Sequence, residues 1–84
     1  MVDYQEFFIL ARGYLAEQLD INAENINPKT TFEEIDADSI DIVEMIMAIE
    51  DKYDVEFPED ELDEFKTMGQ LTQALYDFLV QAKA

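Results

Sequence analysis

Apolar positions recur at helical spacing in three stretches of the chain. In residues 3–19, 40–53 and 67–79 they lie three or four positions apart, as on one face of an α-helix. The first stripe consists of Phe7, Leu10, Ala11, Tyr14, Leu15 and Gln18. The last stripe consists of Leu71, Ala74, Leu75, Phe78 and Leu79. It follows a Thr67-to-Gln70 pattern typical of a capping box. The pattern therefore predicts three amphipathic helices, with Phe8 at the edge of the core.

Two connections separate these helices. Residues 20–37 lack helical periodicity and are rich in turn-forming Asp, Asn and Pro residues. Their apolar residues are spaced as anchors onto a core: Ile21, Ile26, Phe32 and Ile35. After residue 53, Val55 and Phe57 are available to the core, and Pro58 suits the first turn of a short helix over 59–65. The sequence therefore predicts an all-α fold, a small four-helix bundle with three longer helices, one short third helix and a long first loop.

The stretch 40–53 has two faces of different character. At about 100° per residue, the inward arc holds Ile42, Ile46, Ile49 and Tyr53, flanked by Val43 and Met45. The opposite face holds Ile40, Glu44, Met47 and Asp51, with Asp41 and Ala48 beside them. Single exposed apolar residues are common on protein surfaces. An acidic face with apolar side chains in its middle is nevertheless typical of a docking surface.

Length and charge narrow the function. A chain of 84 residues predicts one domain, spanning 1–84. It has 21 acidic and five basic residues, so its formal net charge is −16. Fifteen of the carboxylates lie between Glu33 and Glu64, where Lys52 is the one basic residue. This charge disfavours nucleic acid and anionic membranes as partners and favours basic protein surfaces.

The residue types that are absent exclude several kinds of chemistry. The chain has no Cys and no His, so disulfides, thiolate catalysis, a Ser–His pair and the usual zinc ligand sets are excluded. The N-terminus has no basic region followed by an apolar run, and no stretch is apolar enough to span a membrane. We therefore expect a cytoplasmic protein that is not an enzyme.

One serine lies where the polar turn meets the second helix. Asp38 and Ser39 are both good N-cap residues, so the simplest interpretation of Ser39 is a helix cap. Without a base to activate it, Ser39 is a poor nucleophile. We therefore expect a substrate or carrier role for it. The spacing of Asp36 and Asp38 suggests a calcium loop, but such a loop needs an oxygen ligand, Gly and Glu where this chain has Ile40, Asp41 and Met47. We predict no metal site beyond loose surface binding of cations.

These residues resemble the acyl carrier protein family, whose attachment motif is a Gly-x-Asp-Ser-Leu stretch that opens a recognition helix. Here the motif reads Asp36-Ala37-Asp38-Ser39-Ile40. The helix that follows, residues 41–50, is similar to the family's recognition helix almost position for position, and the resemblance extends from about residue 4 to residue 79. Asp36 replaces the family's glycine. Because Asp tolerates the left-handed conformation better than most residues, we expect the turn to be kept.

The resemblance implies a function for each of these parts. Ser39 would receive 4′-phosphopantetheine from coenzyme A through a phosphopantetheinyl transferase, while Asp38 shapes the turn and caps the helix. The cofactor's thiol would then carry acyl groups as thioesters between enzymes, most simply those of fatty acid biosynthesis. The surface that partner enzymes read would consist of Ile40, Asp41, Glu44, Met47, Glu50 and Asp51. A core that opens for the acyl chain would be lined by Val43, Ile46, Phe57, Leu62, Phe65 and Met68. A monomer with weak, fast, charge-steered binding suits such a carrier.

Two alternatives stay open at this point. One is a dedicated carrier for a polyketide, specialised lipid or aminoacyl pathway. The other is an acidic helical adaptor that binds basic proteins without any cofactor. The adaptor would keep its function in Ser39→Ala, whereas a carrier would lose it.

Overall fold

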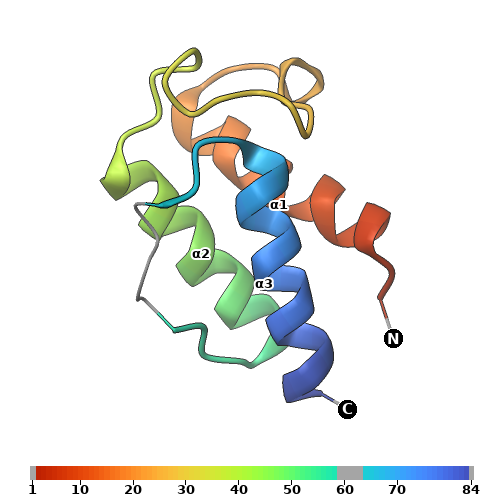
Figure 1. The fold of residues 1–84 in the computed structure, drawn as a ribbon. Helices are drawn as coiled ribbons and strands as arrows, with labels where there is room; N and C mark the ends of the chain where they lie inside the picture. The colour runs from red at the N-terminus through yellow and green to blue at the C-terminus, as the bar shows by residue number, and fades with distance from the viewer. Residues whose placement is uncertain (1, 59–63, 84) are drawn as a thin grey trace.

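The computed structural model describes residues 2–58 and 64–83. Their regular structure consists of the α-helices α1 (Tyr4–Leu19), α2 (Ser39–Tyr53) and α3 (Met68–Ala82), the 3₁₀ turn η1 (Ala23–Asn25) and an isolated bridge (Figure 1). The prediction of an all-α fold is confirmed. The short helix predicted over 59–65 falls mostly outside the described residues. Within those residues, no helix combines the length and apolar content needed to cross a membrane.

The helices begin at residues that satisfy their free backbone N–H groups. Asp3 caps α1 by accepting a hydrogen bond from the Glu6 N–H at 2.7 Å. Thr67 caps α3, and its side chain and that of Gln70 form the predicted capping box. Such caps stabilise a helix by about 1 kcal/mol each, which is why they mark helix starts in the sequence.

Helix α1 packs against both α2 and α3, and its buried face is wider than the sequence stripe suggested. Phe8 is buried with 7% of its surface exposed, which fits its predicted place at the edge of the core. Gln18 is exposed and lines a surface hollow between α1 and α2, so its predicted place on the inward stripe is wrong. The cost of burying an amide without a hydrogen-bond partner explains the difference. The buried residues of α1 are Phe7, Phe8, Ala11, Leu15 and Ala16.

Helices α2 and α3 fill the rest of the core. On α2 the buried side chains are Met45, Ile46 and Ile49, and Ile42 is half-buried. Val43 is 39% exposed, so its expected place beside the core face is wrong. The buried arc of α2 is centred closer to Met45 than the periodicity alone indicated. On α3 the buried side chains are Met68, Leu71, Thr72, Leu75 and Leu79.

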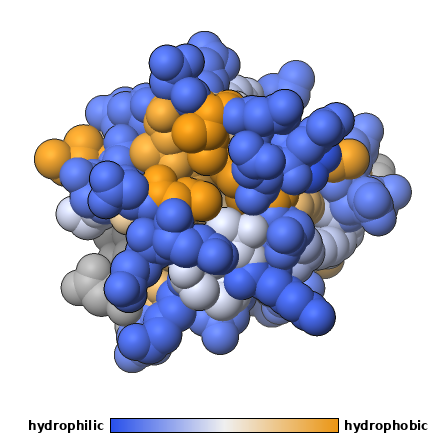
Figure 2. All heavy atoms as spheres, turned by 90° about the horizontal axis from the view of Figure 1, so that it is seen from above, coloured by the Kyte–Doolittle hydropathy of each residue, from blue (hydrophilic) through white to orange (hydrophobic). Residues whose placement is uncertain are grey.

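The segment between α1 and α2 arches over the end of the bundle at which α2 and α3 begin, and both chain ends lie at the opposite end (Figure 1). Ile26 and Phe32 are buried under it, as their spacing predicted, while Ile21 and Ile35 are half-buried. The Arg12 Nη1 atom donates to the Ile26 carbonyl at 3.3 Å and joins this segment to α1. Seen from this end, polar side chains surround an apolar area (Figure 2).

We predict that Gly13→Ala stabilises the protein by about 0.5–1 kcal/mol, because glycine inside a helix loses more conformational entropy than alanine. A Cβ atom at Gly13 would meet nothing within 4 Å, so the methyl group fits without rearrangement. Urea unfolding followed by circular dichroism measures the change. An unchanged or lower midpoint would contradict this account of α1.

Candidate functional site

Helix α2 begins with a capping box built from two aspartates. Asp38 Oδ1 accepts hydrogen bonds from the N–H groups of Ile40 at 3.0 Å and Asp41 at 3.1 Å. Asp41 Oδ2 accepts in return from the Asp38 N–H at 3.2 Å. Asp38 is therefore the N-cap, and Ser39 is the first residue of the helix. Of the two cap candidates in the sequence, the structure selects Asp38, because its carboxylate engages both free amides.

The Ser39 side chain lies at the surface, without a structural task in the described part of the chain. Its residue is exposed, and its hydroxyl makes no hydrogen bond with residues 2–58 or 64–83. The interpretation of Ser39 as the N-cap is therefore wrong. Ser39 is also the only serine in the sequence. An exposed primary hydroxyl without an internal partner fits a point of covalent attachment, and the positive end of the helix dipole beside it favours a phosphate group.

The turn that leads to Ser39 contains a left-handed aspartate. Asp36 has a φ of 57°, so the expectation that aspartate keeps this turn is confirmed. The turn is closed by the Asp36 N–H, which donates to Glu33 O at 3.1 Å, and the Ala37 N–H, which donates to Phe32 O at 2.9 Å. Among the described residues the non-glycine positions with positive φ are all aspartates: Asp20, Asp36 and Asp54.

We expect Asp36→Gly to stabilise the protein by about 0.5 kcal/mol, because relief of the left-handed conformation exceeds the extra entropy of glycine in the unfolded chain. Asp36→Asn is the matched control, since it removes the same charge but keeps a side chain. Thermal unfolding of both variants separates conformation from charge. Equal midpoints for the two variants would show that charge, and not the backbone, sets the stability here.

The predicted partner surface of α2 divides into exposed and structural residues. Ile40 is 67% exposed and Met47 is 56% exposed, and with Val43 they form an apolar stripe along α2. Glu44 and Asp51 are exposed on either side of Met47 in the sequence. We call the three apolar residues the α2 stripe, and we call Glu44 and Asp51 its carboxylates. The stripe gains Val43, which sequence reasoning had assigned to the interior.

The two remaining residues of the predicted partner surface also support the fold. Asp41 is half-buried and takes part in the capping box. Glu50 is half-buried, and its Oε2 atom accepts a hydrogen bond from the Phe57 N–H at 2.8 Å, which ties the segment after α2 to the helix. Substitutions at these two positions would therefore alter the stability of the protein as well as any docking.

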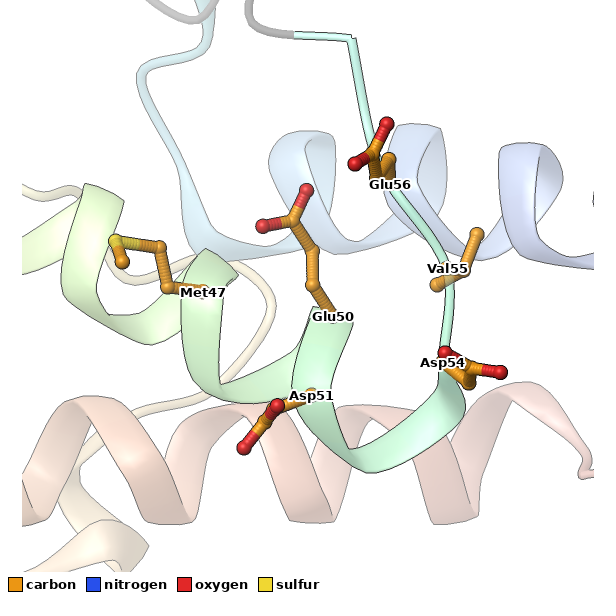
Figure 3. Close-up of a pocket in the computed structure, with 6 residues that line it drawn as sticks. All are labelled: Met47, Glu50, Asp51, Asp54, Val55 and Glu56. Carbon is orange, nitrogen blue, oxygen red and sulfur yellow. The ribbon is translucent and has the colours of Figure 1, made fainter.

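An acidic hollow of about 540 Å³ lies at the C-terminal end of α2 (Figure 3). It is lined by Met47, Glu50, Asp51, Asp54, Val55 and Glu56. Val55 is half-buried against the core, as the sequence predicted, while Asp54 and Glu56 are exposed members of the acidic stretch over residues 33–64. The left-handed C-cap at Asp54, φ 53°, turns the chain back beside α2 and places them at this hollow. Within the described residues, no three acidic side chains converge as the ligands of a metal ion do.

The candidate lining of an acyl pocket is divided by the structure. Ile46, Phe57 and Met68 are buried, and Phe65 is half-buried. Val43 lies at the surface, so it does not line the interior. Leu62 lies outside the described residues.

Comparison with known proteins gives this geometry a family. A family model described as "Phosphopantetheine attachment site" matches residues 11–75, a span that includes the turn, Ser39 and all of α2. The acyl carrier protein of Picosynechococcus sp. is 36% identical over 67 residues, covering 79% of this chain and 83% of that protein. The chain belongs to the acyl carrier protein family.

Two further acyl carrier proteins match over a similar span. That of Helicobacter hepaticus is 37% identical over 62 residues, covering 73% of this chain and 82% of that protein. That of Wolinella succinogenes is 37% identical over 60 residues, covering 70% and 79%. As an acyl carrier protein, the chain is a carrier and not an enzyme, and its cofactor is covalent 4′-phosphopantetheine. Its partners are of two general kinds, a phosphopantetheinyl transferase and the enzymes of acyl synthesis.

Proposed function

We propose that Ser39 is the attachment point of 4′-phosphopantetheine, and that the protein carries the acyl intermediates of fatty acid biosynthesis. The observation that carries this proposal is an exposed hydroxyl, on the only serine of the chain, without a hydrogen-bond partner in the described residues. The cofactor supplies the thiol that forms thioesters, which this cysteine-free chain lacks.

The charges around Ser39 are consistent with covalent attachment and not with reversible binding of phosphate. The N-terminal amides of α2 are already occupied by the Asp38 carboxylate. Asp36 and Asp41 add further negative charge beside the serine. Free phosphate would be repelled, whereas a covalent bond needs no such affinity. The same carboxylates attract a basic transferase.

The α2 stripe and its carboxylates are proposed as the surface that partner enzymes read. Ile40, Val43 and Met47 supply apolar contact, and Glu44 and Asp51 supply the charge that steers basic patches. A small interface of this kind gives weak, fast binding, which lets one carrier serve many enzymes. We propose that the protein acts as a monomer, without nucleic acid or membrane as a partner.

Several finer expectations from the sequence stay predictions. They are the four-helix count with a long first loop, the single domain over 1–84, the cytoplasmic location, and the acyl pocket lined by Ile46, Phe57, Leu62, Phe65 and Met68. The buried side chain of Met68 supports the pocket, because its unbranched, flexible thioether tolerates cargo of varied shape.

The experiment that tests the class of cargo compares two kinds of loading on the phosphopantetheinylated protein. A malonyl transferase of fatty acid synthesis with malonyl-coenzyme A is expected to give rapid gain of one malonyl group in the intact mass. An adenylating enzyme with amino acids and ATP tests the dedicated aminoacyl alternative. Loading only by the second enzyme would replace fatty acid biosynthesis with a specialised pathway, and loading by neither would overturn both assignments of cargo.

A further inference from the structure

The N-terminal turn of α3 is hydrogen-bonded to the segment that leads to Ser39. The Gly69 N–H donates to Pro28 O at 2.9 Å, and the Met68 N–H donates to Thr30 O at 2.9 Å. In the opposite sense, the Phe32 N–H donates to Lys66 O at 3.0 Å. We call these three backbone hydrogen bonds the loop clamp; Thr31 and Thr67 form the antiparallel bridge within it.

The loop clamp uses backbone groups that a helix start leaves free. The first amides of a helix have no partner within the helix and carry the positive end of its dipole. In α3 the amides of Met68 and Gly69 are satisfied by loop carbonyls, and that of Gln70 by the Thr67 hydroxyl at 3.1 Å. The first amides of α3 thus bind the loop carbonyls as they would bind an anionic ligand. These hydrogen bonds fix the distance and the orientation of the loop relative to α3.

Gly69 permits this close approach. A Cβ atom at position 69 would lie 2.6 Å from Pro28 O and 3.0 Å from Pro28 Cβ. The nearer atom belongs to the backbone, so a side-chain rotation cannot relieve the overlap. Any other residue at this position has to move the loop or the helix start. The only other glycine, Gly13, has open space around its Cβ position.

Phe32 links the loop clamp to the turn that carries Ser39. Its N–H is held by Lys66 O in the clamp, and its carbonyl accepts the Ala37 N–H at 2.9 Å. Its side chain is buried in the core. Ala37 directly precedes the Asp38 cap and Ser39. Two hydrogen bonds on one residue therefore connect the start of α3 to the start of α2.

We propose that residues 66–69, which lead into α3 and form its first residues, are a positioning element for Ser39. Gly69 is its key residue, because it lets the loop clamp close and so sets where the transferase finds the serine hydroxyl. This inference rests on the proposed attachment at Ser39. It assigns to α3, which does not bear the serine, a part in presenting it.

The structural half of the proposal is tested without any enzyme. Amide chemical shifts of Gly69→Ala are compared with those of the parent and of Gly13→Ala, a glycine-to-alanine change outside the clamp. We expect Gly69→Ala to shift the amide signals of Phe32, Ala37 and Ser39 and to raise hydrogen exchange at Met68. Gly13→Ala should leave these signals in place. Unchanged Ala37 and Ser39 signals in folded Gly69→Ala would overturn the proposal.

The functional half of the proposal is tested by measuring kcat and KM separately for phosphopantetheinyl transfer, at a temperature where each variant is folded. Docking residues on α2 are unaltered, so KM should stay within about twofold, while kcat falls about tenfold because a small misplacement of a reacting group slows the reaction. Leu79→Ala, at the far end of α3, controls for loss of stability alone. An equal fall in kcat for Leu79→Ala would mean that the effect is general destabilisation and would overturn the proposal.

A second variant tests the loop clamp from the loop side. If Gly69→Ala does not fold, Thr30→Val replaces it, because the Thr30 hydroxyl accepts the Asn27 N–H at 2.9 Å and orders the loop side of the clamp. A smaller shift of the Ser39 signal and a smaller loss of kcat are then expected, and their absence counts against the proposal. If the parent protein gains no phosphopantetheine, the proposed function fails. If the parent and Gly69→Ala gain it at the same kcat, only the positioning role fails.

Discussion

Ser39→Ala is expected to gain no phosphopantetheinyl group under conditions in which the parent protein is fully modified. The variant lacks the hydroxyl of Ser39, which is the only serine of the chain. The fold should be unaffected, because the Ser39 hydroxyl makes no hydrogen bond with the described residues and alanine is the better helix former. Intact mass after incubation with coenzyme A and a transferase measures the loss.

The free energy of unfolding of Ser39→Ala shows whether modification is lost because the attachment site is gone or because the protein is unfolded. We expect the free energy of unfolding to change by less than about 0.5 kcal/mol, as for surface substitutions without a structural role. Asp38→Ala is the informative comparison, since loss of the N-cap should destabilise α2 by about 1 kcal/mol while the hydroxyl remains. Full modification of Ser39→Ala would place the cofactor elsewhere. Unchanged biological function without modification would favour the cofactor-free adaptor.

Reversal of charge at the two carboxylates beside the α2 stripe is expected to give the second-largest effect. In Glu44→Lys/Asp51→Lys, kcat/KM for transfer by enzymes with basic docking patches should fall about 10- to 100-fold at low salt, because electrostatic steering is replaced by repulsion. Both side chains are exposed, and the change relieves repulsion within an acidic region, so the helices should stay folded. Initial rates at several salt concentrations provide the measurement.

A matched control makes the same change in net charge at a different place on the surface. Glu24→Lys/Asp77→Lys alters the net charge by the same amount at exposed positions that belong to η1 and α3 and not to α2. We expect it to lose less than about threefold at low salt, since steering depends on where the charge lies as well as on its sum. Equal losses in the two double variants would mean that overall charge, and not the α2 surface, governs recognition. A loss that persists undiminished in high salt would contradict the electrostatic explanation.

The helices and their caps could be predicted from sequence because they depend on near neighbours in the chain. Apolar spacing placed α1, α2 and α3, and the Thr67-to-Gln70 pattern marked the start of α3. Residues at the edge of a helix face were harder. Val43 lies where an arc drawn at helical spacing meets its boundary, and only the packing of α1 against α2 decides which side is buried.

The details around Ser39 needed the structure for a different reason. Asp38 and Ser39 are equally good caps by residue type, and the hydrogen bonds of the Asp38 carboxylate decide between them. The loop clamp is made of backbone groups from residues far apart in the sequence, so residue types carry almost no signal of it. Gly69 is the one exception, and its meaning depends on its distance from Pro28.

Attachment at Ser39 is tested most directly by tandem mass spectrometry that locates the phosphopantetheinyl group on the parent protein after treatment with coenzyme A and a transferase. We expect one group per chain, on the peptide that contains Ser39 and at the Ser39 oxygen. Attachment at a threonine or tyrosine would contradict the assigned site. No attachment with several transferases would contradict the carrier function itself and leave the acidic α2 surface as the feature to explain.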